Sequence, residues 1–333
     1  MTRPTVVLAG ASGDLGGRIA VALVAGGAQV RALVRPDASP TDLARLRELG
    51  ATPAAADPAD VDEVAAASEG AAVVVSALNG LREVVLDRQS GLLDAAVRAG
   101  VPRFIPSDFS ADFTRTEPGH NRNFDLRREF GGRADRASIR VTSVLNGAFM
   151  DMLGAEMPII QPRLRRVLHW GQADQPLDFT TKDDTAAYTA AAALDATTPR
   201  LLRIAGDTVS ARGIASALSE STGRPYRTLR VGSTASLGAL ASIARQVAPQ
   251  PGQPFPAWQG MQYLHDMFTG QAQLRPLDND RYPDLHWTRL RDHLTGRKVT
   301  APHRTAAGDR VTATATPATT AALSPDPPLL VDR

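Results

Sequence analysis

A glycine-rich turn near the start of the chain constrains the fold more than any other feature. The segment VVLAGASGDLGGRIA places Gly10, Gly13 and Gly16 in a G-x-x-G-x-x-G pattern between an apolar run and a helical pattern. The first glycine permits a tight bend, the second lets the backbone approach a pyrophosphate, and the third lets the helix pack closely. N–H groups at the helix start then face the phosphates, so the pattern predicts dinucleotide binding, the alternative being a turn without a ligand.

Short apolar runs alternate with helical patterns through the first 146 residues. The expected strands are Thr5–Ala9, Val30–Val34, Ala51–Ala55, Ala72–Ala77, Arg103–Pro106 and Ile139–Leu145. Helices are expected to begin near Asp14, Thr41, Asp60 and Leu81. This alternation predicts an α/β fold, a Rossmann-type doubly wound parallel sheet with helices on both faces.

The pattern changes after residue 146. We expect residues 1–146 to form an NADP(H)-binding Rossmann domain and residues 147–295 a smaller α+β substrate lobe, the two being able to interleave in the fold. Residues 296–333 are rich in Thr, Ala and Pro, a composition that predicts a disordered tail.

Within the lobe, the segment RVLHWGQADQPLDFTT predicts a hairpin with a polar turn. The other expected elements are a strand near Leu201–Ile204 and helices at Asp184–Leu194, Ser210–Thr222 and Ala235–Val247. The segment FPAWQGMQYLHDMFTG gathers aromatics and methionines at helical spacing. This spacing favours core packing over the wall of a substrate pocket.

Composition excludes several classes of function. The 333 residues are 43% hydrophobic and 22% charged, with a net charge of only +2, so nucleic acid is not an expected partner. The chain has no cysteine, which excludes disulfides and thiolate chemistry. It has two lysines, Lys182 and Lys298. No apolar run of about 18 residues and no apolar signal segment is present, so we expect no membrane span and a cytoplasmic protein.

The residue after the second expected strand indicates which dinucleotide binds. NAD-binding folds place Asp or Glu there to hold the ribose 2′-hydroxyl, whereas VRALVRPD places Arg35. A guanidinium can bind a 2′-phosphate with two charge-assisted hydrogen bonds, which favours NADP(H) over NAD(H). Asp37 follows Pro36, too far around the turn.

The carboxyl ends of three more strands are expected to line the cofactor groove, because ligands bind there in such sheets. These ends are Asp57, the segment Ser76–Gly80 and the segment Pro106–Phe109. Asp57 precedes a proline and is equally suited to start a turn, as is the Asn79-Gly80 pair.

Four segments together resemble the NmrA-like family, the atypical short-chain dehydrogenase group that includes isoflavone reductase-like enzymes. They are GASGDLG, LVRPD, RFIPSDF and TSVLNGAF, and the resemblance spans roughly residues 4 to 290. It implies a Rossmann domain, a smaller substrate domain and NADP(H). By position it implies that the cofactor is bound by Gly10, Ala11, Ser12, Gly13, Asp14, Leu15, Gly16, Arg35, Asp57, Ser76, Ala77, Leu78, Pro106, Ser107, Arg127, Asn146, Gly147, Ala148 and Phe149, with Asp108 also on the nicotinamide side.

The chain departs from the family pattern at one position. Family reductases carry a lysine in the helix after the F-P-S-E-F segment, and NFDLRREF places Arg127 there. The Tyr-x-x-x-Lys pair of ordinary short-chain dehydrogenases is also absent. Arginine can bond a ribose hydroxyl or an oxyanion but is a poor general acid. Asp125 and Glu129 are expected to face solvent or to pair with Arg128 and nearby arginines.

Two further residues are candidates for proton transfer. His120 lies on the loop before NFDLRREF, and Asp108 can act as an acid if it is desolvated. A solvated histidine and a hydrogen-bonding aspartate are the simpler interpretations. The histidines show no metal-ligand spacing, so no metal is expected. The arginine clusters 133–140 and 163–166 are most simply solvated faces.

Two functions fit these observations. The first is an NADPH-dependent oxidoreductase that transfers hydride to a small carbonyl or conjugated substrate, which we favour. The second is a non-catalytic NADP(H)-sensing regulator that acts through a protein partner, which the missing lysine supports. A monomer or homodimer is expected in either case.

Overall fold

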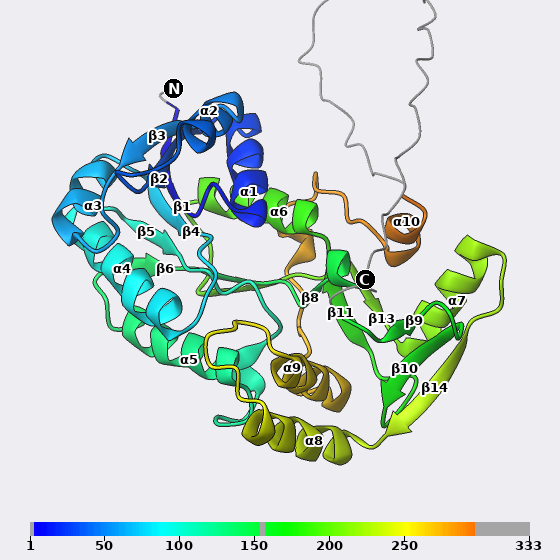
Figure 1. Ribbon diagram of the computed structural model, residues 1–333. Coiled ribbons are helices and arrows are strands. Elements are labelled where there is room, and N and C mark those ends of the chain that lie inside the picture. The colour runs from blue at the N-terminus through cyan, green and yellow to red at the C-terminus, as the bar shows by residue number, and fades with distance from the viewer. Residues whose placement is uncertain (1–2, 154–156, 297–333) are drawn as a thin grey trace, which may run out of the picture. The chain divides into compact units, whose positions relative to one another are not determined.

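The computed structural model describes residues 3–153 and 157–296, all within one compact unit, Met1–Thr300. The disordered tail predicted from residue 296 lies outside the described residues from position 297 onward. The sheet and helices of the described part are shown in Figure 1.

The first half of the chain forms a parallel sheet of six strands in the order β3-β2-β1-β4-β5-β6. Its strands are β1 (Thr5–Ala9), β2 (Gln29–Val34), β3 (Thr52–Ala55), β4 (Val73–Ser76), β5 (Arg103–Ile105) and β6 (Arg140–Val141). The order reverses between β1 and β4, where doubly wound sheets open a crevice at the carboxyl ends of their strands. The predicted Rossmann-type fold is confirmed.

Helices cover both faces of this sheet (Figure 1). They are α1 (Asp14–Ala25), α2 (Pro40–Glu48), α3 (Val61–Ser68), the π-helical segment Glu83–Arg88, α4 (Gln89–Arg98) and α5 (Arg122–Ala134). Val6 and Leu8 of β1 pack in one core cluster with α1, while Val7 packs in another with α3, α4 and α5. This division follows from the alternation of side chains along a strand.

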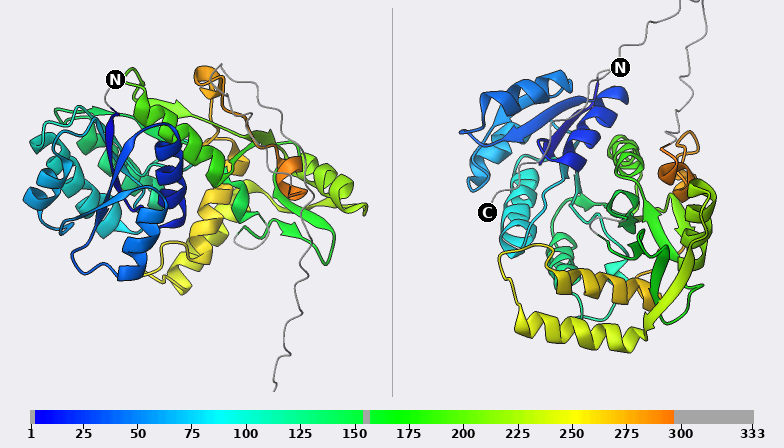
Figure 2. Two further views of the ribbon diagram at one scale, coloured as in Figure 1. Left: turned by 90° about the horizontal axis from the view of Figure 1, so that it is seen from above. Right: turned by 45° about the vertical axis from the view of Figure 1, so that its right-hand side comes forward.

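Helix α6 (Lys182–Leu194) comes from the second half of the chain but packs beside α1 (Figure 2). Its Tyr188 is fully buried in the same core cluster as Leu23 of α1. Arg103 of β5 is buried as well, and its guanidinium donates to the carbonyls of Ala192 (2.7 Å) and Ala193 (2.8 Å) near the end of α6. The two halves therefore share a core.

The strand predicted over Ile139–Leu145 is two strands. After β6, a second strand β7 (Ser143–Leu145) pairs in parallel with β12 (Leu201–Arg203) in a separate two-stranded sheet. The N–H of Thr142 still donates to a carbonyl of β5 at 3.0 Å, but the N–H of Ser143 donates to the carbonyl just before β12 at 2.9 Å. The chain thus changes hydrogen-bonding partner between these two residues.

Two sheets of three strands follow, β13-β11-β8 and β14-β10-β9. Their strands are β8 (Ala148–Phe149), β9 (Ile160–Gln161), β10 (Arg166–Trp170), β11 (Leu177–Thr180), β13 (Asp207–Val209) and β14 (Arg227–Gly232). The remaining helices are α7 (Ala211–Thr222), α8 (Thr234–Val247), α9 (Ala257–Thr269), α10 (Leu290–Leu294) and the 3₁₀ segments Phe113–Arg115, Met150–Met152 and Asn279–Arg281.

The hairpin predicted for RVLHWGQADQPLDFTT is wrong. Its two halves are β10 and β11, which lie in different sheets. All four residues of β11 are buried, whereas burial alternates along β10. A strand buried on both faces belongs inside a sheet, and β11 lies between β8 and β13 rather than beside β10.

The aromatic segment forms α9 and packs mainly in the core. Leu264, Met267 and Phe268 join the third core cluster, with Phe268 and Trp170 ring centroids 5.7 Å apart. On another side of the helix, Gln262 and His265 line a cavity, so core packing and a cavity wall both occur.

Candidate cofactor-binding and active site

The loop after β1 and the first turn of α1 each have one position that admits only glycine. Gly10 has a φ of +83°, and a Cβ there would lie 2.7 Å from the carbonyl oxygen of Ala77 at the end of β4. A Cβ at Gly16 would lie 2.0 Å from the carbonyl oxygen of Gly10. The start of α1 therefore packs directly against the loop, as the predicted glycine roles require.

Helix α1 begins without a side-chain cap. Its N-cap, Gly13, forms no side-chain hydrogen bond, whereas a Ser, Thr, Asp or Asn side chain caps α2, α3, α5, α6, α7 and α8. Uncapped N–H groups at the positive end of a helix dipole form a site for an anion. The predicted phosphate-loop residues Gly10, Ala11, Ser12, Gly13, Asp14, Leu15 and Gly16 all lie in this loop and the first turn of α1.

Sequence reasoning missed one cation at this loop. Lys182, at the start of α6, donates from Nζ to Asp14 at 2.8 Å, and Arg18 donates to the other oxygen of Asp14 at 2.7 Å. These hydrogen bonds lower the pKa of Asp14. Two cations thus neutralise the acid at the anion-binding end of α1. No motif signals Lys182, because 168 residues separate it from its partner.

Arg35 follows β2 and lines a cavity of about 810 Å³. Arg88 and Arg133 also line this cavity, but each pairs with a carboxylate, at 2.6 and 2.5 Å. Arg35 is 67% exposed, and the carboxylate of Asp37 lies 3.6 Å away. Its guanidinium is therefore the one best placed to receive an added phosphate.

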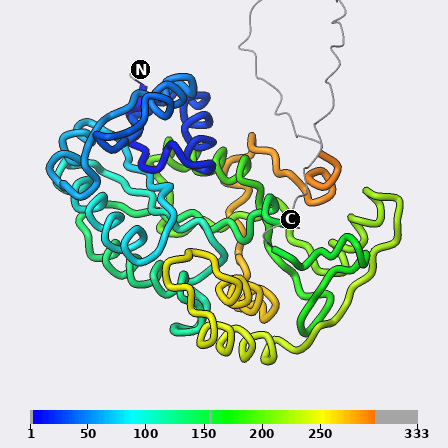
Figure 3. Tube along the Cα trace, in the orientation of Figure 1, coloured from blue at the N-terminus to red at the C-terminus, as the bar shows by residue number. Residues whose placement is uncertain are grey.

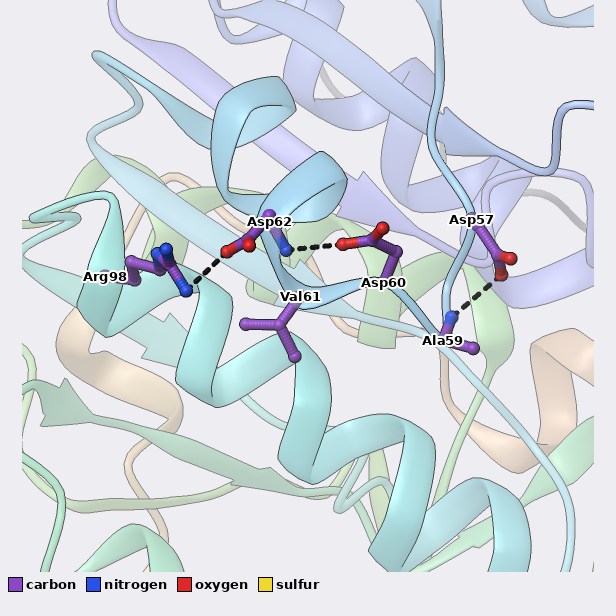
Figure 4. Close-up of a pocket in the computed structure, with 6 residues that line it drawn as sticks. All are labelled: Asp57, Ala59, Asp60, Val61, Asp62 and Arg98. Atoms are coloured by element: carbon purple, nitrogen blue, oxygen red, sulfur yellow. Dashed lines mark hydrogen bonds and ion pairs between the residues drawn. The ribbon is translucent and has the colours of Figure 1, made fainter.

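Asp57 forms a turn at the rim of this cavity. It accepts the N–H of Ala59 at 2.9 Å, and a smaller cavity of about 320 Å³ adjoins it (Figure 4). In that smaller cavity, Asp60 accepts the N–H of Asp62, whose carboxylate pairs with Arg98. These side chains satisfy one another, so they serve the turn and the start of α3.

The ends of β4 and β5 contribute buried polar groups. Ser76 is fully buried, and its hydroxyl has no hydrogen-bond partner among the described residues. Ala77 donates its N–H to Ala9 at 2.9 Å, and Leu78 is half-buried. After β5, which ends before Pro106, the N–H of Ser107 donates to the side chain of Gln89 at 2.8 Å.

Asp108 is the most deeply buried acid of the site. Its side chain is fully buried, one oxygen accepts the Ser143 hydroxyl at 2.6 Å, and the other has no partner among the described residues. Burial raises the pKa of Asp108, while the Ser143 hydrogen bond and the charges of Arg127 and Arg200 act in the opposite direction. A carboxyl with a raised pKa and a free oxygen can hold and deliver a proton.

Two residues behind Asp108 were not predicted from sequence. Arg200 donates to the Ser143 hydroxyl at 2.7 Å and to the Asp135 carboxylate at 2.6 Å. The hydroxyl therefore receives a hydrogen bond and directs its own proton to Asp108. The sequence holds no motif linking 108, 143 and 200; β7 and its partner strand β12 bring them together.

Arg127 is buried within α5, only 8% exposed. Its Nη1 donates to the carbonyl of Asn123 at 3.1 Å, and its Nε has no partner among the described residues. The flanking charges are engaged elsewhere: Arg128 pairs with Asp125 at 2.9 Å, and Glu129 pairs with Arg82 of another segment at 2.6 Å. Arg127 alone of this group retains an unused donor in the interior.

The predicted nicotinamide-side stretch follows β7. Asn146 is fully buried, and both polar atoms of its side chain lack partners among the described residues. Gly147 has a φ of +69°, and a Cβ there would lie 2.3 Å from the carbonyl oxygen of Asp178. Ala148 and Phe149 then form β8.

His120 is exposed, unlike the buried Asp108 and Arg127. Its side chain is 61% exposed, pairs with Glu117 at 3.6 Å, and lines a cavity between α8, α9 and the loop before α5. Within the described residues, no group of three or more His, Cys, Asp or Glu side chains is arranged to hold a metal ion. None of the described helices has the length and apolar character needed to cross a bilayer.

Fold and loop geometry define a dinucleotide-binding protein of the Rossmann class. The model of the NmrA-like family matches residues 2–279, and the chain belongs to this family. Its sequence is 30% identical to pinoresinol reductase 2 and 29% identical to pinoresinol reductase 1, both from Arabidopsis thaliana, over 200 residues. These matches cover 56% of the chain and 63% of each relative, so the chain spans less than two thirds of their length.

Solved structures show the same fold at lower identity. AtPrR2 with NADP⁺ and (+)pinoresinol has a TM-score of 0.76 and 23% identity, covering 90% of this chain and 100% of that chain. Leucoanthocyanidin reductase with NADPH from Vitis vinifera has a TM-score of 0.72 and 19% identity, with coverage of 88% and 99%. The NADPH-dependent quinone oxidoreductase QOR2 from Escherichia coli has a TM-score of 0.67 and 18% identity, with coverage of 87% and 98%.

Proposed function

We propose that the protein is an NADP(H)-dependent oxidoreductase that reduces a small carbonyl or conjugated substrate. The observation that carries this proposal is the pair of buried, unsatisfied polar groups on Asp108, which follows the carboxyl end of β5, and on Arg127 of α5, whose charge acts on Asp108. Buried polar groups without partners are rare in folded proteins, and a functional site accounts for them. The reductase names of the relatives point the same way.

The residues present fit the cofactor. The uncapped start of α1 suits the pyrophosphate, and Gly10 and Gly16 let the loop pack tightly between the end of β4 and the first turn of α1. Arg35 suits a 2′-phosphate, and Asn146 offers an amide with free donors and acceptors. When bound there, NADPH supplies the hydride.

Asp108 and Arg127 divide the remaining chemistry. The raised pKa of Asp108 keeps its carboxyl able to deliver a proton to the developing oxyanion or carbanion. Arg127 stays charged and hydrogen-bonds a ribose hydroxyl or the oxyanion instead of giving up a proton. Ser143 and Arg200 orient Asp108 from behind.

Cofactor choice is tested by Arg35→Ala. Loss of a charge-assisted contact to the 2′-phosphate is expected to weaken NADPH binding by roughly 10- to 100-fold and to leave NADH binding nearly unchanged. Titration calorimetry with both cofactors measures this, with the exposed Arg136→Ala as control. Equal losses for NADPH and NADH in Arg35→Ala refute the assignment.

Catalysis is tested by NADPH oxidation against a panel of aldehydes, ketones and enones. Arg127→Ala is expected to lower kcat by roughly 100-fold on any substrate that the wild type turns over, and Arg127→Lys to retain activity. Asp108→Asn is expected to lower kcat similarly while NADPH still binds.

A second function is favoured by one observation, arginine in place of the family lysine. We infer as the alternative a non-catalytic NADP(H)-sensing regulator acting through a protein partner. If wild type, Arg127→Lys and Arg127→Ala all bind NADPH and none oxidises it with any panel member, the enzyme proposal fails and the regulator proposal stands. Whether the protein is a monomer or homodimer stays a prediction.

A further inference from the structure

A separate cavity of about 690 Å³ lies between α8, α9 and the loop before α5. Figure 3 shows α8 and α9 side by side in this region. The volume is in the range of roughly 300 to 1,000 Å³ that suits a small ligand. None of the groups proposed to bind the cofactor lines it.

The lining is rich in hydrogen-bond donors and contains no carboxylate. Arg245 contributes a guanidinium that stacks over Trp258 at 5.5 Å and has no carboxylate within ion-pair distance among the described residues. The hydroxyl of Ser242 donates to the carbonyl of Gly238 at 3.0 Å, and the imidazoles of His120 and His265 lie 3.6 and 3.3 Å from carboxylates outside the lining. The free donors of the cavity therefore include those of Arg245 and Gln262. A set of donors around one unpaired cation suits an oxyanion.

One lining side chain is both buried and partly unused. Gln262 is only 7% exposed, and its carbonyl oxygen accepts the N–H of Arg122 at 3.3 Å. Its amide NH₂ donates to no residue in the described part of the chain, and the side chain lines the cavity. The NH₂ group is open to the cavity rather than enclosed by protein, so it is free to donate to a ligand bound there.

Small residues on α8 create the hollow. Ala235, Gly238, Ala239 and Ala241 form its floor, and a Cβ at Gly238 would lie 3.2 Å from the ring of His265. Larger side chains on this face would fill the space. The floor therefore offers apolar contact for the body of a ligand whose charged end meets Arg245.

The opposite wall is held rigid by buried hydrogen bonds. Asp266 accepts from His265 at 3.3 Å and from Asn121 at 2.9 Å, and Asn121 in turn accepts from Gln259 at 2.8 Å. Asn121 also caps α5. A wall fixed in this way loses little entropy when a ligand binds.

We propose that this cavity binds a small organic oxyanion, a carboxylate or a phosphate monoester. Arg245 and the Gln262 amide hold the charged group, and the alanine and glycine floor of α8 holds the apolar body. The site is independent of the proposed oxidoreductase function, because it shares no residue with the groove for the dinucleotide.

The test is titration calorimetry with benzoate, phenyl phosphate and the neutral, similarly shaped benzyl alcohol. The full-length protein is first saturated with NADPH, so that the glycine loop is not available to phosphate. Benzoate or phenyl phosphate is expected to bind one per chain with a Kd of about 1 mM or below, and benzyl alcohol at least about tenfold more weakly. Whichever anion binds identifies the source of the oxyanion.

Variants of the lining residues test whether the anion binds in this cavity. Arg245→Gln is expected to weaken the anion at least about tenfold, and Ala239→Leu to abolish binding by filling the cavity. The matched control Arg224→Gln removes an exposed arginine outside the cavity and is expected to change nothing. All three variants should bind NADPH with equal affinity. A failure of the anion-site proposal can therefore be told apart from a failure of the cofactor assignment. No saturation by either anion up to about 10 mM, or equal affinity in Arg245→Gln and Arg224→Gln, overturns the proposal.

Discussion

Asp108 shows how a single residue can set a chemical property through burial. Its carboxyl is enclosed at the end of β5, where only one of its two oxygens is hydrogen-bonded by a described residue. Enclosure disfavours the charged form, so the folded protein retains a proton that the unfolded chain releases.

This proton makes stability depend on pH. Above the ordinary pKa of 3.8 the unfolded chain is ionised while folded Asp108 is still protonated, so stability falls as pH rises towards the raised pKa. Asp108→Asn does not titrate. Its free energy of unfolding, relative to wild type, is therefore expected to increase as the pH rises above 3.8.

Urea denaturation at several pH values measures this difference. Asp174→Asn is the control, because Arg212 lowers the pKa of this exposed carboxyl and its contribution changes only below pH 3.8. The difference for Asp174→Asn should stay level above about pH 5. A level difference for Asp108→Asn as well would contradict a raised pKa.

Some site residues were predictable one by one and others were not. Arg35 follows a strand in a recognisable motif, and Asp108 belongs to the RFIPSDF segment. Ser143, Arg200 and Lys182 act through partners 35 to 168 residues away in the chain. Such contacts depend on tertiary packing, which local sequence patterns do not encode.

At the scale of elements, the strands and helices of the first half were predicted well because their periodicity is strong. β1 was predicted with the observed bounds, and α1 begins at the predicted Asp14. The second half was harder, because short strands there pair with distant strands. Register between β10 and β14 joins residues about 60 apart, which no local turn signal announces.

The glycines of α1 allow a test of local packing. A methyl group at Gly16 would overlap the carbonyl of Gly10, whereas one at Gly17 would lie an ordinary 3.5 Å from the carbonyl of Ala11. Gly16→Ala is expected to destabilise the protein by more than about 2 kcal/mol. Gly17→Ala is expected to be neutral or stabilising by up to about 1 kcal/mol, because alanine favours helix.

Urea unfolding of the two variants gives the comparison. Both substitutions add the same methyl group to the same helix, so any shared effect on helix propensity cancels. Equal stabilities would show that the close contact between α1 and its loop does not constrain the fold.

At the scale of the whole molecule, Lys182 connects the second half of the chain to the start of α1, where we propose that the cofactor binds. Removing its ammonium leaves Asp14 less neutralised beside the expected pyrophosphate. Lys182→Met is therefore expected to weaken NADPH binding several-fold, because the negative charge of Asp14 then repels the negatively charged pyrophosphate more strongly.

Removing the Asp14 carboxylate provides the control for Lys182→Met. In the double variant Asp14→Asn/Lys182→Met, most of the lost affinity should return, because the repulsion is removed with its source. Calorimetric titration with NADPH measures both. If Lys182→Met binds NADPH as tightly as wild type, Lys182 has no part in the cofactor site.

The place of α6 beside α1 has a consequence for how this family can be recombined. A hybrid joined at residue 146 would combine the β5 arginine of one parent with the helix end that it caps in the other. It would also pack the apolar surface of α1 from one parent against that of α6 from the other, although these two surfaces did not evolve together. Exchange of the second half of the chain between relatives should therefore succeed only when residues 182–194 stay with the parent that supplies α1.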